Sequence, residues 1–480
     1  MRGRGAGMTT TLANVAVARG GATGRPSSSA GWVVVFVLTM FACQAMIAFG
    51  PFPGIRTWLR VAVYAFSLVL VALTRGAGPR HPAVLPATAA LLIVGLSLFH
   101  PDTPGYVPGA IHAGLYLAIL APLFWAPRLH IDAQMLKRVL VLIWAFHSLS
   151  AALGVLQVQF PGTFDPNLSA VIDPDVASAS VITNARGDVV YRAMGVSDIP
   201  GAAGVSGLYA AAIGTALFVV DRRRLMRVLC VASMTLALTS IYLAQLRSTL
   251  VIAALIVSSF VVCLALRRSR RALLTLIIVV LTLLASLNIA VLIGGTEVFD
   301  RIATLVEERP QAVYYANRGQ FLEQTFTENL PDYPLGAGLA RWGMASYYFG
   351  GGNSAGQSPS LWVEIQWTGW IFDGGIPLLL AYSGAVAAAL IMAVRLRRRM
   401  ESSSPMFVWA SLIVAYDLGA IALTFSYPLF IGEFGLQFWL LNGLLFAACS
   451  RELRPSRGMV AADISWPRVG TRASAPGGPA

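Results

Sequence analysis

The stretch RRSRRALLTLIIVVLTLLASLNIAVLIG, residues 267–294, decides the class of fold. It opens on a cluster of arginines and continues over 272–294 as an almost unbroken apolar run. A helix of about 20 mainly apolar residues is long enough to cross the hydrocarbon core of a bilayer. The sequence therefore predicts a membrane-spanning helix over 272–294, with positive charge at one end.

The same pattern recurs along the chain. Of its residues, 56% are hydrophobic and 12% are charged, whereas soluble domains carry roughly 25% charged residues. We therefore expect an all-α polytopic membrane protein with about 12 transmembrane helices. The candidate spans are 32–49, 57–74, 83–99, 108–126, 139–159, 203–220, 225–245, 248–266, 272–294, 367–393, 406–425 and 429–449.

The net charge of +13 is compatible with a nucleic-acid partner, but its distribution favours another explanation. Basic residues gather in short connections, as in DRRRLMR at 221–227 and RLRRR at 395–399. The cytoplasmic loops of polytopic proteins carry such an excess of arginine and lysine. Placing the N-terminal tail inside puts these clusters on one side of the membrane. We therefore predict that both chain ends lie inside, and we expect no nucleic-acid partner.

This topology divides the chain into three parts. Residues 1–30 and 455–480 are rich in Gly, Ala, Ser, Pro and Arg, and we expect them to be disordered cytoplasmic tails. Residues 31–454 form the transmembrane domain. Its extracytoplasmic loops at about 160–202 and 295–366 are long, and long loops in compact proteins are usually functional or disordered.

Cysteine and histidine give no sign of a metal site or a cofactor. The cysteines fall inside apolar runs, where packed thiols are expected; they are Cys43, Cys230, Cys263 and Cys449. No group of histidine, cysteine and carboxylate has metal-ligand spacing, and no Walker A or kinase motif occurs. None of the histidines lies in either long outer loop. We therefore expect no metal and no cofactor.

The second long loop contains two patterns typical of helices. Residues 300–310 begin with an aspartate in the N-cap position and end at a proline. Residues 317–331 have the spacing of a capping box between Asn317 and Gln320, followed by an apolar stripe. We predict two short helices that lie over the outer face of the membrane.

Arginines on the outer side run against the topological bias of charge. Arg247 lies between the seventh and eighth spans, Arg192 precedes the sixth, and Arg318 opens the second loop helix. Each side chain could simply reach headgroups or solvent. A guanidinium also matches the oxygens of a phosphate, so these residues are candidates for binding a phosphorylated substrate.

A glycine turn follows the second loop helix. Gly336 and Gly338 precede Arg341 and Trp342, and the backbone amides of such a turn can approach an anion. Trp342 belongs either to an interfacial aromatic belt or to a surface that stacks on sugar rings. These four residues are candidates for substrate binding.

Acidic side chains supply the remaining candidates. Glu364 is a possible general base or the partner of a loop arginine, and Asp373 is a possible substrate-binding residue. On one straight helix, Glu364 and Asp373 would lie about 2.5 turns apart and face opposite sides. Asp417 falls within the eleventh span, where an ionisable group indicates a function or a buried partner.

Four segments, in this order, resemble the O-antigen polymerase/ligase superfamily of bacterial membrane proteins. They are YRAMGVSDIPGAAGVSGLYA (191–210), LAQLRSTLV (243–251), the loop from Arg318 through NLPDYPLGAGL (329–339), and VEIQWTGWIFDGGIPLLL (363–380). Together with the expected spans, the resemblance covers most of the chain.

This resemblance implies glycosyl transfer at the extracytoplasmic face, without a metal. The donor would be an undecaprenyl-diphosphate-linked oligosaccharide in the bacterial inner (cytoplasmic) membrane. Arg247 and Arg318 resemble the family's motif arginines, which would stabilise the leaving diphosphate. Glu364 stands where the ligase branch has a histidine, which favours an O-antigen or exopolysaccharide polymerase over an O-antigen ligase. A chain-length regulator and a flippase are possible partners.

Other functions are compatible with the same architecture. Twelve spans with both ends inside also suit a polysaccharide flippase or another transporter, which would carry polar residues at the midplane and broken spans in matched halves. A membrane scaffold for glycan assembly is a third alternative. The scarcity of charge within the spans favours the enzyme.

Overall fold

The computed structural model describes residues 28–50, 53–74, 78–166, 181–183, 189–267, 270–299, 303, 310–349 and 360–453. Of the helix expected over 300–310, the structure describes only residues 303 and 310. Of the two expected tails it describes only residues 28–30, where α1 begins.

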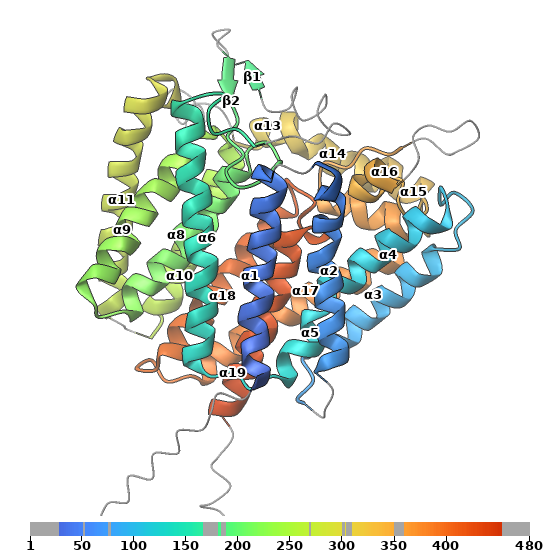
Figure 1. Ribbon diagram of the computed structural model, residues 1–480, viewed down its shortest axis with the longest axis horizontal. Coiled ribbons are helices and arrows are strands. Elements are labelled where there is room, and N and C mark those ends of the chain that lie inside the picture. The colour runs from blue at the N-terminus through green and yellow to red at the C-terminus, as the bar shows by residue number, and fades with distance from the viewer. Residues whose placement is uncertain are drawn as a thin grey trace, which may run out of the picture.

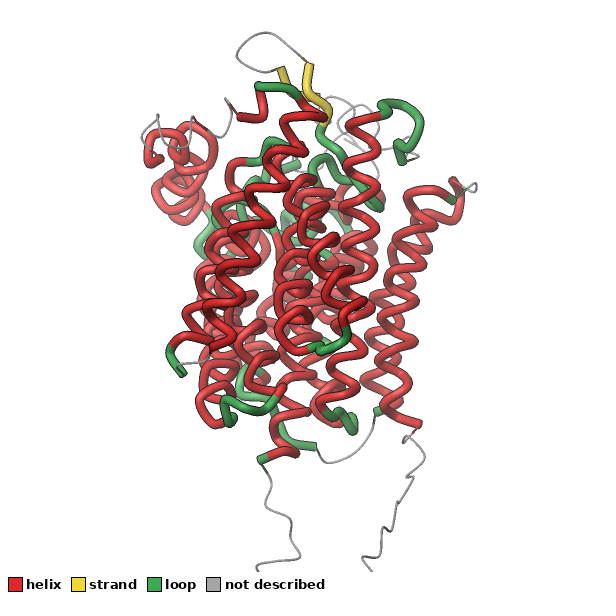
Figure 2. The backbone as a smooth tube through the Cα atoms, turned by 90° about the vertical axis from the view of Figure 1, so that its left-hand side faces the viewer, coloured by secondary structure: helices red, strands yellow, loops and turns green. Residues whose placement is uncertain are grey.

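The described chain is a bundle of long helices that run side by side (Figures 1 and 2). Their bounds are α1 Ser28–Phe49, α2 Arg56–Leu73, α3 Val84–Ser97, α4 Tyr106–Leu120, α5 Pro122–Trp125, α6 Ala133–Gln159, α8 Ala202–Val220, α9 Arg224–Leu243, α10 Arg247–Ala265, α11 Arg270–Gly294, α17 Gln366–Arg399, α18 Pro405–Leu423 and α19 Glu433–Glu452. Among the described residues, ten helical segments are long and apolar enough to cross a membrane. The prediction of a multi-pass helical membrane protein is confirmed at this level.

Two of the twelve expected spans fall outside that set of ten. Helix α3 has 14 residues, and at 1.5 Å per residue it reaches about 21 Å, less than the ~30 Å of a hydrocarbon core. It packs along α17. Helix α19 has 20 residues but carries Glu433 in its first turn and Arg451 in its last. It begins four residues later than the expected span because Leu429–Ile431 form a separate 3₁₀ turn.

Helix α8 lies at the centre of one half of the bundle, and almost every residue in it is buried. Its sequence AAGVSGLYAAAIGTALFVV is rich in small residues, which let helix backbones approach closely in membranes. A Cβ atom at Gly207 would lie 2.5 Å from the carbonyl oxygen of Ala237 in α9. The small side chains therefore determine how closely α8 and α9 pack.

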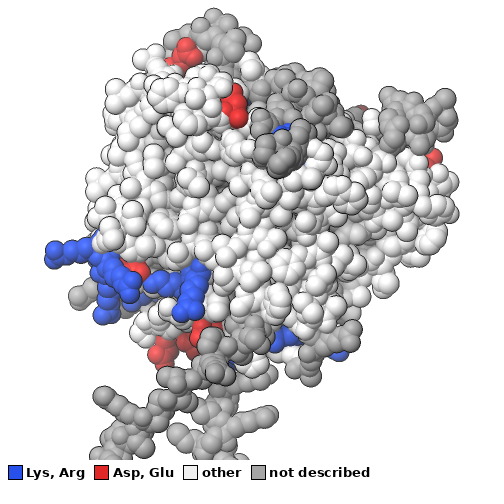
Figure 3. Space-filling view, in the orientation of Figure 1, with Lys and Arg blue, Asp and Glu red and all other residues white. Residues whose placement is uncertain are grey.

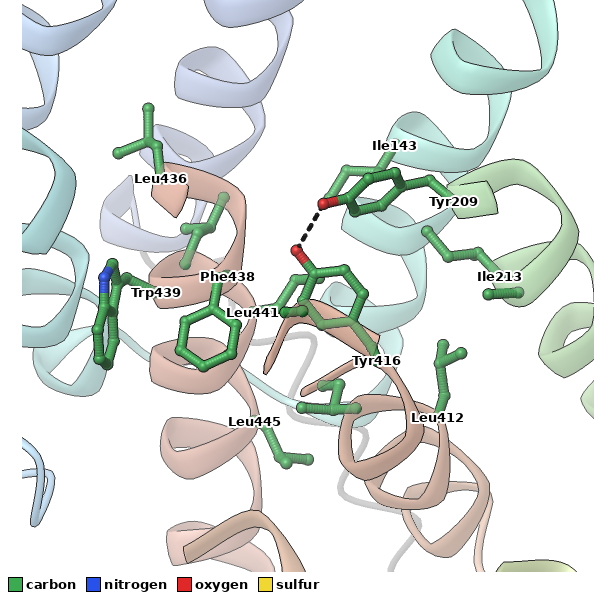
Figure 4. Packing of buried hydrophobic residues seen from close by; sticks show 14 of the residues in the cluster. Ile143, Tyr209, Ile213, Leu412, Tyr416, Leu436, Phe438, Trp439, Leu441 and Leu445 are labelled. Carbon is green, nitrogen blue, oxygen red and sulfur yellow. Dashed lines mark hydrogen bonds between the residues drawn. The ribbon is translucent and has the colours of Figure 1, made fainter. Parts of the chain in front are cut away.

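Several polar side chains inside the bundle have partners within it. Figure 4 shows the hydroxyl groups of Tyr209 and Tyr416 joined by a hydrogen bond of 3.1 Å and surrounded by apolar side chains. The amide of Asn442 donates to Asp417 Oδ1 over 2.9 Å. Because lipid offers no hydrogen bonds, such internal pairing is what an ionisable side chain in a span requires. The sequence indicated that Asp417 has either a function or a buried partner, and the structure shows a buried partner, Asn442.

Basic side chains gather near one end of the bundle on the face drawn in Figure 3. Arg267 Nη2 donates to the carbonyl oxygen of Arg398 over 2.6 Å. The arginine cluster between α10 and α11 therefore lies beside the cluster at the end of α17. Lys137 and Asp221 form an ion pair of 2.7 Å that links the start of α6 to the end of α8.

The opposite end carries the short elements, seen at the top of Figure 1. These are β1 Val181–Thr183, β2 Val189–Tyr191, α13 Pro310–Tyr314, α14 Gln320–Gln324, α15 Leu330–Asp332 and α16 Gly343–Phe349. The two strands pair antiparallel, with Ile182 opposite Val190. This small sheet was not predicted, since three-residue strands leave little periodicity to detect.

The second loop helix is longer than the sequence indicated. Two π-helical turns, Tyr315–Gly319 and Thr325–Asn329, join α13, α14 and α15 into one helical segment over 310–332, which we call the loop helix. The predicted capping box is wrong, because Asn317 lies inside this segment and donates to the carbonyl oxygen of Val313. Pro310 begins the loop helix, in keeping with the tolerance of a first helical turn for proline.

Helix α17 is broken by a kink at Gly374 and Gly375, where the backbone leaves helical geometry. Gly375 has a φ of 62°. Its missing Cβ would lie 2.1 Å from the carbonyl oxygen of Pro334. The straight-helix geometry considered for Glu364 and Asp373 does not apply, because Glu364 lies in a bend before α17 and Asp373 adjoins the kink.

Candidate functional site

Arg318 and Glu364 form an ion pair at the end of the bundle that carries the short elements. Arg318 lies in the first π-helical turn of the loop helix, and Glu364 lies just before α17. Trp362 Nε1 donates to the other carboxylate oxygen of Glu364 over 2.9 Å. The structure thus brings together the predicted arginine and the predicted base, and each oxygen of the carboxylate has a donor.

Arg192 lies within electrostatic reach of both members of this ion pair. Burial, and next the neighbouring Arg318, lower the pKa of the Arg192 guanidinium, while Glu364 opposes that shift. The three residues come from β2's end, the loop helix and the segment before α17, which are far apart in sequence. Because Glu364 already neutralises Arg318, the Arg192 guanidinium adds a further positive charge near the pair. This excess of positive charge is suited to an anion.

Arg247 begins α10, at the same end of the bundle. The residue before it, Leu246, packs against Gly201, whose Cβ would lie 2.8 Å from Leu246 Cδ1. Two residues before Arg247, Gln245 has a φ of 52°, which side chains other than glycine rarely adopt. The turn therefore holds Arg247 next to the segment that follows Arg192, but Arg247 is not part of the Arg318–Glu364 pair.

The glycine turn is packed against its neighbours. The amide of Ala337 donates to the carbonyl oxygen of Phe372 over 2.7 Å, and the amide of Leu339 donates to Thr103 Oγ1 over 3.2 Å. A Cβ at Gly338 would lie 2.8 Å from the Thr103 nitrogen. Gly336 and Gly338 both have positive φ, of 104° and 92°. The turn thus fastens the loop to the kink of α17 and to the α3–α4 connection, and two of its amides are engaged there.

Arg341 borders a cavity of about 840 Å³. Its side chain is buried, and Nη1 donates to the carbonyl oxygen of Ala337 over 3.1 Å. The carbonyl oxygen of Arg341 accepts from the amide of Leu361, which ties it to the segment that leads to Glu364. Ala340, directly before it, has a φ of 60°. Arg341 is therefore rigidly held at the cavity wall.

The cavity has the size of a small-molecule site and mixed walls. It is lined by parts of α1, α2, α4, α16 and α19, by the loop before α8, and by residues 360–363. Its aromatic lining consists of Tyr64, Trp342, Tyr347, Trp362, Tyr427 and Phe434. Aromatic faces with a few fixed polar groups suit a ligand with both apolar and hydroxylated surfaces.

Charged residues that were not among the predicted site residues also line this cavity. Arg60 of α2 forms an ion pair with Asp198, and its guanidinium carbon lies 5.3 Å from the ring centre of Tyr348. Glu433, at the start of α19, lies within electrostatic reach of Arg60. Asp198 belongs to one of the segments that carry the family resemblance, but only the folded chain shows that it meets Arg60.

Asp373 is fully buried and has three hydrogen-bond partners. Tyr116 donates to Oδ2 over 2.7 Å, Trp342 Nε1 donates to Oδ1 over 2.8 Å, and His112 Nε2 lies 3.1 Å from Oδ2. In this arrangement Asp373 anchors Trp342, which lines the cavity, and contributes no free oxygen to it. His112 and Tyr116 were missed because α4 offered only an apolar span.

No protein-family model and no curated protein sequence matches this chain.

Proposed function

We propose that this protein is a membrane glycosyltransferase of the polysaccharide polymerase type. It transfers an oligosaccharide from undecaprenyl diphosphate to a growing glycan at the outer face of the bacterial cytoplasmic membrane, and needs neither metal nor cofactor. The observation that carries this proposal is the convergence of Arg192, Arg318 and Glu364 beside a cavity with aromatic walls.

In this proposal the arginines stabilise the negative charge of the leaving diphosphate. As the bond between the sugar and the diphosphate breaks, negative charge grows on the leaving phosphate, and fixed positive charge lowers the barrier. Arg318 and Arg192 form the primary diphosphate site, and Arg247 and Arg341 extend it along the outer end of the bundle. A guanidinium presents a planar fork of donors that matches phosphate oxygens.

Glu364 has a different role from the one expected of a base. Its oxygens accept from Arg318 and from Trp362, so it holds Arg318 in position before the substrate arrives. The incoming diphosphate then competes with Glu364 for the Arg318 guanidinium. Arg318 is thus neutralised by Glu364 before the substrate arrives and by the diphosphate afterwards.

The proposed topology has twelve spans, with α3 and α19 included, and both chain ends in the cytoplasm. The basic clusters at one end of the bundle support this orientation, since cytoplasmic loops carry the excess of arginine. The cavity then opens at the outer side, where nucleotide sugars are not supplied. The donor must therefore arrive already activated on a lipid.

Two rival functions receive less support. A transporter requires a polar path through the midplane, and the pocket of about 10 Å³ beside Tyr209 and Tyr416 is lined mainly by apolar side chains. An O-antigen ligase is expected to carry a histidine in the long outer loop, and residues 295–366 contain none.

Deletion of the gene, followed by complementation, tests the proposal. Cells that lack a polymerase display single-repeat glycan on their surface, which a gel resolves from polymer. Wild-type protein and Arg224→Ala, an exposed cytoplasmic-end control, are expected to restore polymer, whereas Arg318→Ala and Arg192→Ala are not. Accumulation of finished lipid-linked polymer would indicate a ligase, and repeat units trapped inside would indicate a flippase. Either result would overturn the proposal.

A further inference from the structure

His112 is a buried histidine at the wall of the cavity. It lies near the start of α4, is 1% exposed, and borders the cavity together with Trp342 and Arg341. Its ring packs edge to face against Trp342, with 5.8 Å between the ring centres. The position of the ring is therefore fixed by its neighbours.

The hydrogen bonds of Asp373 determine which nitrogen of His112 carries the proton. A carboxylate can only accept, and Asp373 already accepts from Tyr116 and Trp342. His112 Nε2, 3.1 Å from Oδ2, is therefore the donor of the third bond. In the neutral ring the proton lies on Nε2, and Nδ1 keeps an unshared electron pair.

Within the part of the chain that the structure describes, Nδ1 of His112 has no hydrogen-bond partner. An unpaired buried acceptor is costly, and native proteins seldom keep one without a reason. Another buried histidine, His147, shows the contrast, because its two nitrogens face Ser206 at 3.3 Å and Gln437 at 3.1 Å. His112 therefore has a buried nitrogen without a partner, on a side chain that lines the cavity.

We propose that His112 is the catalytic base that activates the acceptor sugar, and that Asp373 is its positioning residue. This inference rests on the proposed function. The acceptor hydroxyl gives its proton to Nδ1, and its oxygen forms the new bond to the anomeric carbon of the donor. The bond between that carbon and the diphosphate oxygen breaks, and its electron pair leaves with the lipid diphosphate. The proton on Nδ1 is then released to the departing phosphate.

Two carboxylates compete for this role and are less suitable. Glu364 already accepts a hydrogen bond on each oxygen, from Arg318 and from Trp362. Glu433 lies at the start of α19 near Arg60, where an acidic side chain also serves to stabilise a helix N-terminus. Neither has the orienting contact that Asp373 gives to His112.

The test uses the purified full-length protein in lipid nanodiscs with an undecaprenyl-diphosphate-linked oligosaccharide and measures polymer formation. His112→Gln keeps a donor for Asp373 but has no basic nitrogen. We expect its kcat to fall by roughly 10²- to 10⁴-fold, the usual contribution of a general base, while KM for the lipid donor stays within about threefold. His147→Gln, a buried histidine outside the cavity lining, serves as the matched control and is expected to keep kcat within about tenfold of wild type, on the same scale. Glu433→Gln tests the rival carboxylate in the cavity wall.

Two further measurements separate a catalytic role from a structural one. Added imidazole is expected to restore part of the kcat of His112→Ala, and Asp373→Asn is expected to add little to the loss in His112→Gln, since the two act as one unit. An unchanged kcat in His112→Gln, or a loss that falls on Glu433→Gln instead, would overturn the inference and leave the proposed function standing. A wild-type protein that binds the donor and makes no polymer would overturn both.

Discussion

Arg318 illustrates how one side chain acquires meaning from its neighbours. From the sequence, Arg318 was an outer arginine that either reaches solvent or binds a phosphate. In the fold it pairs with Glu364 and lies within electrostatic reach of Arg192. The sequence left this pairing open, because Glu364 could act either as a general base or as the partner of a loop arginine. The contact itself joins residues separated by 46 positions, which no local periodicity indicates.

Replacing Arg318 tests its role at this scale. Arg318→Ala is expected to lower the initial rate of polymer formation by roughly 10²- to 10³-fold, the usual loss for one transition-state donor. Arg318→Lys should recover only part of that rate, because an ammonium lacks the planar fork. Arg224→Ala is the control. A rate for Arg318→Ala within about threefold of wild type would rule out a diphosphate ligand at this position, given the size of that expected loss.

The elements around the site owe their geometry to a few contacts. At the kink of α17, the Pro334 carbonyl occupies the space that a side chain at Gly375 would fill. The glycine turn packs against the kink through the bond from the Ala337 amide to the Phe372 carbonyl. The sequence predicted the turn and the helix but not their contact. It also missed the π-helical turns of the loop helix, which depend on packing and not on local propensity.

Gly375→Ala is expected to destabilise the protein by about 1–3 kcal/mol, since the new Cβ combines a positive φ with overlap of the Pro334 carbonyl. Gly384→Ala, on the same helix, is the matched control, because its Cβ would meet nothing closer than Pro86 Cβ at 3.9 Å. Thermal unfolding in detergent measures both. Equal unfolding midpoints would show that the kink tolerates a side chain.

The loop helix is joined to α17 by a buried hydrogen bond of 2.6 Å between the hydroxyls of Thr325 and Thr368. Thr325→Val should weaken this attachment by about 1 kcal/mol and raise hydrogen exchange across 310–332. Thr327→Val removes only a bond within the helix itself, to the Glu323 carbonyl, on an exposed face. Similar exchange in the two variants would contradict the attachment.

At the scale of the whole molecule, apolar runs and arginine clusters were sufficient to predict a multi-pass helical bundle. They could not predict which spans surround the cavity, because the Asp373–His112 contact joins positions 261 residues apart. The composition of α4 predicts a membrane span but gives no sign that His112 in it contacts Asp373. Charge in the outer loops indicated the region of the site, and the interior wall of the cavity came only from the fold.

The topology makes its own prediction. All four native cysteines are buried. Labelling of a cysteine introduced at an exposed position therefore shows on which side of the membrane it lies, once labelling of the wild-type protein has been subtracted. In intact cells, a membrane-impermeant maleimide should label Thr327→Cys in the loop helix and leave Ser403→Cys, between α17 and α18, unlabelled. The reverse pattern would contradict the proposed orientation.

Transfer of a lipid-linked glycan by the purified protein is the most direct measurement of the central claim. Nanodiscs that contain only this protein and an undecaprenyl-diphosphate-linked oligosaccharide should yield glycans of several repeats, together with free undecaprenyl diphosphate. The yield should fall in Arg318→Ala and persist in Arg224→Ala. Binding of the donor without any lengthening of the glycan, in wild-type protein that is folded, would contradict the account.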